Sequence, residues 1–287
     1  MIISSLMINA CGKLRESNIG DAAKDVELFL CDILKCKKMD LYMSSRNTIP
    51  REQIDIFDSY IARRLKREPV AYILGRKGFH EFEFIVDKNV LIPRPETEIL
   101  VETCLDMIRK DVKGYEILDL CTGSGAIAVS VAKKYPFVKM TASDISKKAL
   151  KVAKLNAEKY KVTPNIKFIE SDLFRGLDKE KKFHLIISNP PYVPREEMKG
   201  LMDDVRLYEP KEALDGGKEG MKFYREIIRR APYYLHPGGF LALEIGWYQI
   251  GPVRTMFMNS GKFDIIKTVR DYAMIDRIIV VKVKKNG

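Results

Sequence analysis

The sequence predicts a doubly wound α/β fold with a mostly parallel, seven-stranded, Rossmann-like sheet, preceded by a small all-helical domain and a β-hairpin linker. Three observations support this prediction. Strand patterns and helical patterns alternate through the larger, C-terminal part of the chain, a glycine-rich turn follows the first of those strands, and the N-terminal part shows helical periodicity alone. We expect the helical domain at residues 1–75, the linker at 76–95 and the α/β domain at 96–287.

The N-terminal part of the chain carries apolar residues at the spacing of amphipathic helices. After a proline that suits a first helical turn, Ile54, Phe57, Ile61 and Leu65 recur every three or four residues. Residues 21–35 show a similar pattern. Because no alternating, strand-like pattern occurs in this part, we expect it to be helical throughout.

The linker is predicted from a change in pattern. Apolar and polar residues alternate over 82–86, a turn signal follows at 87–89, and a short apolar run occupies 90–92. This pattern indicates a β-hairpin with its turn at 87–89. Two prolines end it, and a helix is expected at 96–107.

Seven short apolar runs in the C-terminal part are candidate strands. They lie at residues 116–120, 138–143, 166–170, 184–188, 240–244, 263–269 and 277–283. Helical patterns separate most of them, notably at 126–134, 146–160 and 221–234. Such alternation gives a parallel sheet with helices on both faces, joined by right-handed crossovers. No helical pattern separates the last two runs, so we expect the final strand to be antiparallel to its neighbours.

The composition indicates a folded protein with an excess of positive charge. Of its 287 residues, 46% are hydrophobic, so a large core can form, and the formal net charge is +11. This charge favours acidic partners, but a genome rich in lysine explains it equally well. The lysines are spread along the chain rather than gathered in one block, which argues against a dedicated nucleic-acid tail.

Cysteine usage and hydropathy indicate the compartment. There are five cysteines without a Cys-x-x-Cys pair and only three histidines, so we expect neither a disulfide framework nor a metal site. No apolar run approaches the roughly 18 residues that a membrane span needs. We therefore expect a cytoplasmic protein with no membrane partner.

A glycine-rich turn follows the strand at 116–120 and precedes the helix at 126–134. Ligands of open α/β sheets bind at such strand ends, and glycine lets a ligand approach the main chain closely. The spacing matches a loose dinucleotide fingerprint, but it also suits S-adenosyl-L-methionine, and a tight turn without a ligand is a third interpretation. The residues of this turn are Cys121, Thr122, Gly123, Ser124 and Gly125.

Carboxylates at three strand ends help to decide between the cofactors. Asp119 would repel a pyrophosphate, whereas it suits the cationic amino-acid end of S-adenosyl-L-methionine. Asp144 can accept the ribose hydroxyls of either cofactor. Asp172 is expected to accept the adenine amino group, with Leu173 against the ring, although a turn or helix cap is the alternative for Asp172. Together these residues favour S-adenosyl-L-methionine.

The segment Asn189-Pro190-Pro191-Tyr192 is the most informative in the chain. Its prolines fix the backbone and remove two donors, and Asn189 is kept extended by the proline after it. The Asn189 amide oxygen and the Pro190 carbonyl can accept both N–H bonds of a planar amide or amine, with Tyr192 against its flat face. Such positioning can carry most of a methyl transfer from a sulfonium. A proline-rich turn with an Asx cap is the structural alternative.

With these motifs, the sequence resembles the protein-(glutamine-N5) methyltransferases that modify peptide-chain release factors. The resemblance covers nearly the whole chain. Besides the glycine turn and the Asn-Pro-Pro-Tyr segment, it includes Leu-Ile-Pro-Arg-Pro-Glu-Thr-Glu at 91–98, Tyr-Glu-Pro at 208–210 and Ala-Leu-Asp-Gly-Gly at 213–217. It implies a helical domain that helps to bind the factor, a hairpin linker and a methyltransferase domain. The acceptor that it implies is the glutamine of a Gly-Gly-Gln motif.

The resemblance also implies roles for individual residues. By motif match, the glycine turn from Cys121 to Gly125, Asp144, Leu173 and Asn189 line the cofactor site, and Asn189 to Tyr192 hold the glutamine. Two residues depart from the family pattern. Cys121 stands where glycine is frequent, and Leu173 stands where an aromatic residue often covers the adenine.

Other functions would use the same residues. A DNA adenine-N6 methyltransferase would share the Asn-Pro-Pro-Tyr segment, but it must flip a base and usually needs a separate recognition domain. Glutamine methylation of a ribosomal protein is the protein-substrate alternative. A basic, non-enzymatic adaptor would have no need of Asp119, Asp144, Asn189 and Tyr192 together. We expect a monomer that methylates release factors and requires no nucleic acid.

Overall fold

The computed structural model describes residues 1–112 and 114–284 and divides the chain into two compact units. The first unit contains Met1–Gly75 together with Met202–Tyr208, and the second contains the other described residues. The sequence prediction placed 202–208 in the α/β domain. In the structure, this segment instead packs with the helical unit.

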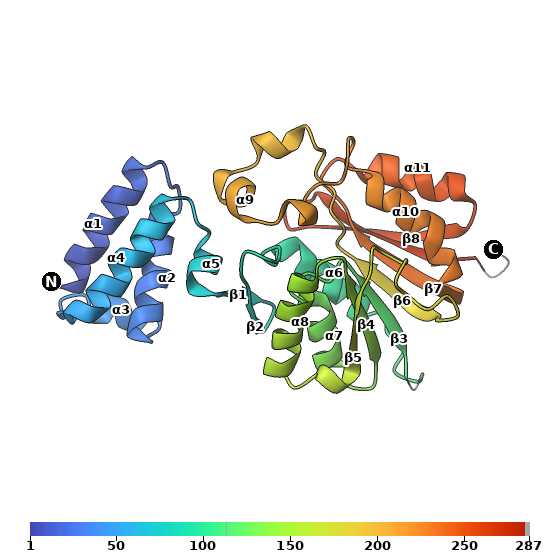
Figure 1. The fold of residues 1–287 in the computed structure, drawn as a ribbon, viewed down its shortest axis with the longest axis horizontal. Coiled ribbons are helices and arrows are strands. Elements are labelled where there is room, and N and C mark those ends of the chain that lie inside the picture. The colour runs from blue at the N-terminus through green and yellow to red at the C-terminus, as the bar shows by residue number, and fades with distance from the viewer. Residues whose placement is uncertain (113, 285–287) are drawn as a thin grey trace. The chain divides into compact units, whose positions relative to one another are not determined.

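Short helices build the first unit (Figure 1). They are α1 (Ile3–Glu16), α2 (Ala22–Leu34), α3 (Lys38–Met43), α4 (Arg51–Leu65), α5 (Val70–Leu74) and α9 (Asp203–Tyr208). Their apolar faces meet in a core that includes Phe29 and Phe57. Helices α2 and α4 were predicted from periodicity. The short helices α3, α5 and α9 were not, because one or two turns are too short to show a period.

A buried arginine explains why α9 packs with the helical unit. The Nε of Arg64 donates to Asp25 Oδ2 at 2.7 Å, and its Nη1 lies 2.7 Å from Asp204 Oδ2. A buried charge is stable only with close partners, so these two carboxylates fix α9 against α4. The Tyr208 hydroxyl adds a hydrogen bond of 2.6 Å to the Lys66 carbonyl.

The β-hairpin lies earlier in the chain than predicted. Its antiparallel strands are β1 (Arg76–Phe79) and β2 (Phe82–Ile85), joined by a tight turn in which His80 has a φ of 51°. The segment 90–92, predicted as the second strand, is not a strand. There the N–H of Ile92 donates to Glu209 Oε2 at 3.2 Å, so a side chain takes the place of a ladder partner.

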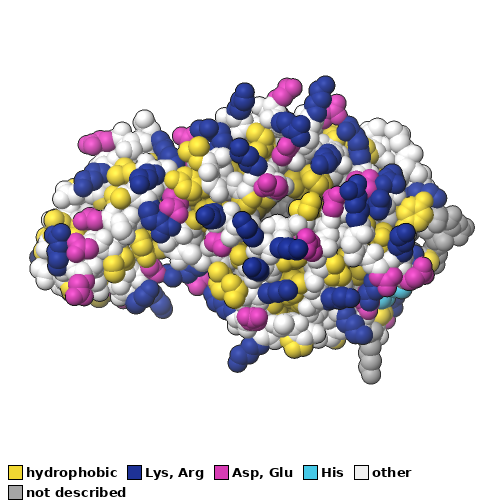
Figure 2. Space-filling model, in the orientation of Figure 1, with side chains coloured by type: hydrophobic (Ala, Val, Ile, Leu, Met, Phe, Trp, Pro, Cys, Tyr) yellow, Lys and Arg dark blue, Asp and Glu magenta, His cyan; other side chains and the backbone are white. Residues whose placement is uncertain are grey.

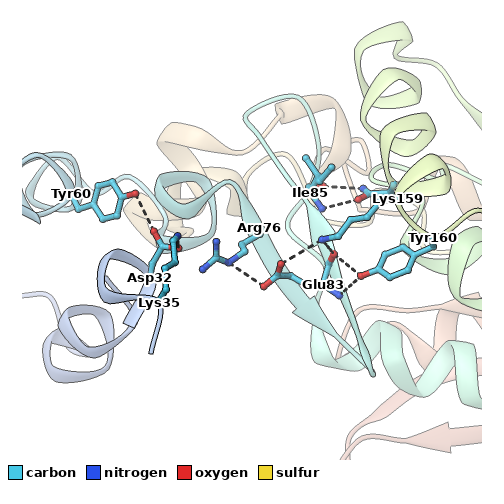
Figure 3. Close-up of polar contacts among 9 residues, drawn as sticks. Asp32, Lys35, Tyr60, Arg76, Glu83, Ile85, Lys159 and Tyr160 are labelled. Atoms are coloured by element: carbon cyan, nitrogen blue, oxygen red, sulfur yellow. Dashed lines mark hydrogen bonds and ion pairs between the residues drawn. The ribbon is translucent and has the colours of Figure 1, made fainter. Parts of the chain in front are cut away.

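Strand β2 is fixed to helix α8 (Lys147–Lys159) by polar contacts (Figure 3). The Asn156 side chain accepts from the N–H of Ile85 at 2.7 Å and donates to its carbonyl at 3.0 Å. The Tyr160 hydroxyl accepts from the N–H of Glu83 at 2.7 Å. Asn156 therefore replaces the missing ladder partner of a two-stranded sheet.

The second unit is built on a seven-stranded sheet with the order β5-β4-β3-β6-β7-β9-β8. Its strands are β3 (Glu116–Leu120), β4 (Lys139–Asp144), β5 (Ile166–Glu170), β6 (Phe183–Ser188), β7 (Leu235–Glu244), β8 (Phe263–Arg270) and β9 (Asp276–Val283). Strands β3 to β7 run parallel, and β9 lies antiparallel between β7 and β8. The predicted fold class and the antiparallel final strand are confirmed.

Helices cover both faces of this sheet (Figure 1). One core contains residues of α6 (Pro95–Leu105), α7 (Ala126–Lys134) and α8, and the other contains residues of α10 (Lys222–Arg230) and α11 (Ile250–Ser260). Ile117 belongs to the first core and Leu118 to the second. Neighbouring residues of a strand point to opposite faces, so this division follows from the pleat.

The surface carries its positive charge in a dispersed form. Figure 2 shows lysine and arginine side chains spread over the visible face and interspersed with acidic ones. This agrees with the even spread of lysine along the sequence. Within residues 1–112 and 114–284, no helix is long and apolar enough to cross a bilayer.

Candidate functional site

A cleft of about 740 Å³ lies at the carboxyl ends of the parallel strands. The strand order reverses between β3 and β6, and this is the place where open α/β sheets bind ligands. The predicted site residues in its wall are Cys121, Gly123, Asp144, Asp172, Leu173, Asn189 and Pro191. Other predicted residues lie outside the wall, namely Asp119, Thr122, Ser124, Gly125, Pro190 and Tyr192.

The turn after β3 needs unusual backbone angles. Cys121, Gly123 and Gly125 have φ values of 62°, 56° and 79°. A Cβ on Gly125 would also lie 3.0 Å from the Cβ of Ala153, so glycine is required there on two grounds. The positive φ at Cys121 is a conformation that favours glycine, so the β-carbon there carries strain.

Asp144 ends β4 and organises this turn. Its Oδ2 accepts from the N–H of Gly123 and its Oδ1 accepts from the N–H of Ser146, both at 2.9 Å. Burial raises the pKa of this carboxyl, but the two backbone donors oppose that effect. Asp144 also lines the cleft, so its remaining lone pairs are available to a ligand.

Asp119 lies beneath the turn rather than in the cleft wall. It is fully buried, and its Oδ2 accepts from the Thr122 hydroxyl at 2.6 Å. Its Oδ1 has no hydrogen-bond partner among the described residues, and burial raises its pKa to about 7. Direct contact with a cofactor stays a prediction for Asp119. In its ionised form, a carboxylate at this place favours a cation over a pyrophosphate.

The third strand end also reaches the cleft. Leu173 has a φ of 50°, and the Ser171 hydroxyl holds it there by donating to its carbonyl at 2.5 Å. Asp172 lines the cleft, while its Oδ2 lies 2.9 Å from Nη1 of Arg175. Asp172 therefore takes part in a local ion pair, and its contact with adenine stays a prediction.

The Asn-Pro-Pro-Tyr segment begins directly after β6, beside the glycine turn. Asn189 and Pro191 face the cleft. The Asn189 Nδ2 donates to Oγ1 of Thr97 at 3.0 Å, and the Tyr192 hydroxyl lies 3.5 Å from Oε1 of Glu244. Burial raises the pKa of the Tyr192 phenol, so it stays neutral at physiological pH.

Glycines hold the backbone of this segment in place. A Cβ on Gly216 would lie 2.7 Å from the carbonyl carbon of Tyr192, and one on Gly220 would lie 2.3 Å from its oxygen. That oxygen accepts from Nε2 of Gln249 at 2.9 Å, and Gly216 donates to the Val193 carbonyl at 2.8 Å. The Ala-Leu-Asp-Gly-Gly motif is thus packed directly against the corner formed by Asn189 to Tyr192.

Sequence reasoning missed the residues behind the corner. Thr97, Glu244 and Gln249 were not selected, although all three are buried polar groups that contact it. Two sequence signals pointed to them. Thr97 lies within the Ile-Pro-Arg-Pro-Glu-Thr-Glu motif, and Glu244 is an acidic residue that ends an apolar strand.

The Ile-Pro-Arg-Pro-Glu-Thr-Glu motif also contacts Glu209 of the Tyr-Glu-Pro segment. Arg94 Nη2 donates to Glu209 Oε1 at 2.6 Å, so the Tyr-Glu-Pro segment is held to the start of α6. Glu209 is buried, whereas Arg94 is partly exposed. Glu209 therefore fixes the residues just before the start of α6, through Ile92 and Arg94.

Comparisons with known proteins identify the two domains and the fold. A family model described as the PrmC N-terminal domain matches residues 5–75, and a model described as the methyltransferase small domain matches residues 95–216. A crystal structure of a methyltransferase from Pyrococcus furiosus superposes with a TM-score of 0.53 at 20% identity, covering 79% of this chain and 98% of that one. This likeness concerns the fold.

Relatives with assigned functions match along nearly the whole chain. The release factor glutamine methyltransferase of Thermodesulfovibrio yellowstonii is 40% identical over 97% of this chain and 100% of its own length. That of Clostridium acetobutylicum is 37% identical over 98% of both chains. With the cleft, the glycine turn and the Asn-Pro-Pro-Tyr corner in place, the chain belongs to the family of release factor glutamine methyltransferases, which use S-adenosyl-L-methionine.

Proposed function

We propose that this protein transfers a methyl group from S-adenosyl-L-methionine to the N5 nitrogen of the glutamine in the Gly-Gly-Gln motif of peptide-chain release factors. One observation carries the proposal. Asn189 opens into the same cleft as the glycine turn and Asp144, so an acceptor amide and a cofactor can meet there. The family to which the chain belongs supports the choice of acceptor.

The cleft wall supplies groups that suit each part of the cofactor. We assign Asp144 to the ribose hydroxyls, because its carboxylate faces the cleft with lone pairs to spare. Asp172 and Leu173 are assigned to the adenine, and the turn from Cys121 to Gly125 to the amino-acid end. When bound, S-adenosyl-L-methionine supplies an already activated methyl group.

The acceptor amide is a weak nucleophile, because its lone pair is delocalised into the carbonyl. Asn189 Oδ1 and the Pro190 carbonyl accept its two N–H bonds and direct the nitrogen into the cleft. These acceptors also stabilise the positive charge that grows on the nitrogen during transfer. Positioning by rigid groups is therefore the main contribution of the protein.

A general base is not needed before transfer. The methylated nitrogen carries two protons and a positive charge, so it is acidic and releases one proton to water after the transfer. Tyr192 does not serve as a base, because burial raises the pKa of its phenol. We assign it instead to the flat face of the glutamine side chain, where an aromatic ring fits by shape.

The preference for a release factor must arise away from the reacting amide. Free glutamine amides are abundant, so specificity needs contacts elsewhere on the partner. We assign this recognition to the helical unit, which the α/β fold does not itself require. We further propose that the protein acts in the cytoplasm as a monomer, without nucleic acid.

Methyl transfer to three acceptors, measured side by side, tests the proposal. The full-length protein is incubated with S-adenosyl-L-methionine labelled in its methyl group and with a release factor, ribosomal proteins or DNA. We expect label in the release factor alone. A factor whose motif glutamine is replaced by alanine should stay unlabelled, and label in DNA or in ribosomal proteins instead would refute the assignment.

A further inference from the structure

A chain of three buried side chains stands behind the cleft. Thr97, in the first turn of α6, donates its hydroxyl to Glu244 Oε2 at 2.7 Å. The same Thr97 oxygen accepts from Asn189 Nδ2 at 3.0 Å. Thr97 and Glu244 are buried, with exposed fractions of 5% and 1%, whereas Asn189 reaches the cleft.

The order of donors in this chain is set by chemistry. When Glu244 is ionised, its carboxylate can only accept, so Thr97 must give it its single hydroxyl hydrogen. The Thr97 oxygen is then left as an acceptor, and only the NH₂ group of Asn189 can satisfy it. The Oδ1 of Asn189 is thereby turned away from Thr97, and it makes no hydrogen bond to another described residue.

We propose that Thr97 and Glu244 are positioning residues, which hold the Asn189 side chain so that its Oδ1, and not its NH₂ group, is presented to the acceptor amide. This proposal rests on the proposed function. An amide side chain has nearly the same shape in its two orientations, so packing alone selects between them weakly. A flipped Asn189 would present two donors to a substrate that also presents donors.

Glu244 also lies behind the other end of the corner. The Tyr192 hydroxyl is 3.5 Å from its Oε1, and the Tyr224 hydroxyl lies 3.1 Å from its backbone carbonyl. The charged groups that face its carboxylate are Glu96 on α6 and Arg277 on β9. Arg277 is paired with Asp271 at 2.8 Å, which limits its help to Glu244.

The protonation of Glu244 should therefore affect the orientation of Asn189. Burial raises its pKa to about 7. A protonated Glu244 can donate to Thr97, which can then donate to Asn189 and draw Oδ1 towards itself. Methyl transfer should consequently rise with pH through this range, as the carboxylate forms and fixes the productive order of donors.

The first experiment removes the hydroxyl without changing the shape of the side chain. We compare Thr97→Val with Thr97→Ser, which keeps the hydroxyl, and with Thr103→Val, an identical change at another buried threonine of α6. For Thr97→Val we expect kcat to fall roughly 10- to 100-fold, the range seen when groups that orient metal ligands are removed. Thr97→Ser should recover most of this loss, and Thr103→Val should stay within about twofold of wild type.

Two further measurements separate positioning from a loss of structure. The affinity for S-adenosyl-L-methionine, from calorimetry, should be the same for Thr97→Val and Thr103→Val, and the thermal midpoints of both variants should lie above the assay temperature. The second experiment records kcat from about pH 6 to about pH 8.5, which brackets the raised pKa of Glu244. Wild type should lose activity at the acid end, whereas Glu244→Gln should give a flatter profile because glutamine does not titrate.

The outcomes distinguish this inference from the proposed function. If wild type does not label the release factor, the proposed function fails. If wild type labels the release factor but Thr97→Val and Thr103→Val have the same kcat, the inference about Thr97 fails while the proposed function stands. Equal loss of cofactor affinity and of kcat in Thr97→Val would assign Thr97 a structural role and overturn the inference. If kcat falls at low pH in Glu244→Gln as it does in wild type, Glu244 does not control the orientation of Asn189.

Discussion

Replacing Glu244 with glutamine should remove a defined part of the pH dependence of stability. The carboxyl is fully buried, and burial raises its pKa from 4.5 to about 7. Between these values the folded protein binds a proton that the unfolded chain has released. The free energy of unfolding must therefore decrease as pH rises through this window and level off above about pH 7.

The magnitude follows from the size of the shift. Each pKa unit corresponds to about 1.4 kcal/mol, and the group is too deeply buried for solvent to screen much of the effect. Between about pH 5 and about pH 8.5, the ionisation of Glu244 should cost the folded state about 2–3 kcal/mol. The buried Asp119 has a similar pKa and adds its own loss, but it is present in both proteins.

The assay is chemical unfolding of wild type and Glu244→Gln, followed by circular dichroism at both pH values. The quantity of interest is the difference between their pH dependences, because effects common to both proteins cancel. Between about pH 5 and about pH 8.5, the free energy of unfolding should fall by about 2–3 kcal/mol more in wild type than in the variant. Parallel pH dependences would show that Glu244 ionises normally in the folded protein, and the order of donors inferred around Thr97 would lose its pH sensitivity.

Three other substitutions test separate parts of the structure. Asn189→Ala should lower kcat by roughly 100- to 1,000-fold, with cofactor affinity kept in calorimetry, and near wild-type turnover would exclude its assigned role. Asp144→Ala should weaken cofactor binding by about 1.5–3 kcal/mol, and an unchanged affinity in a folded variant would contradict the ribose assignment. Asp25→Ala leaves the buried Arg64 with Asp204 as its remaining carboxylate partner and should destabilise the fold by roughly 3 kcal/mol in urea. The exposed Asp21→Ala is its control, and equal midpoints would refute the effect.

The fold was predictable because its strands are short, apolar and separated by helices with a clear period. The strand at 166–170 and the helix at 126–134 match the structure at both ends. The hairpin was misplaced, since its true turn at His80 contains no glycine, asparagine or proline and therefore shows no turn signal. Its attachment depends on Asn156, a helix residue far along the chain whose role no local pattern reveals.

Part of the candidate site followed from the sequence for a related reason. The glycine turn, Asp144 and Asn189 come directly after strands, and parallel strands bring their carboxyl ends together. Asp119 also belongs to such an end. Because it lies one residue before the end of β3, its side chain is buried beneath the glycine turn instead of facing the cleft. Thr97 lies on a helix outside this rule, so only the structure places it against Asn189.

The segment 202–208 changes how the helical unit should be tested. A direct test of the helical unit would delete residues 1–75 and compare a whole release factor with a short peptide as acceptors. That deletion would remove Arg64 and the Lys66 carbonyl, which hold Asp204 and Tyr208. The segment Met202–Tyr208 would then lose these contacts. A loss of activity on both acceptors would therefore not separate recognition from support. Exposed residues of the helical unit, such as Ile8 and Met39, are therefore better positions for substitutions that test the proposed recognition of the release factor.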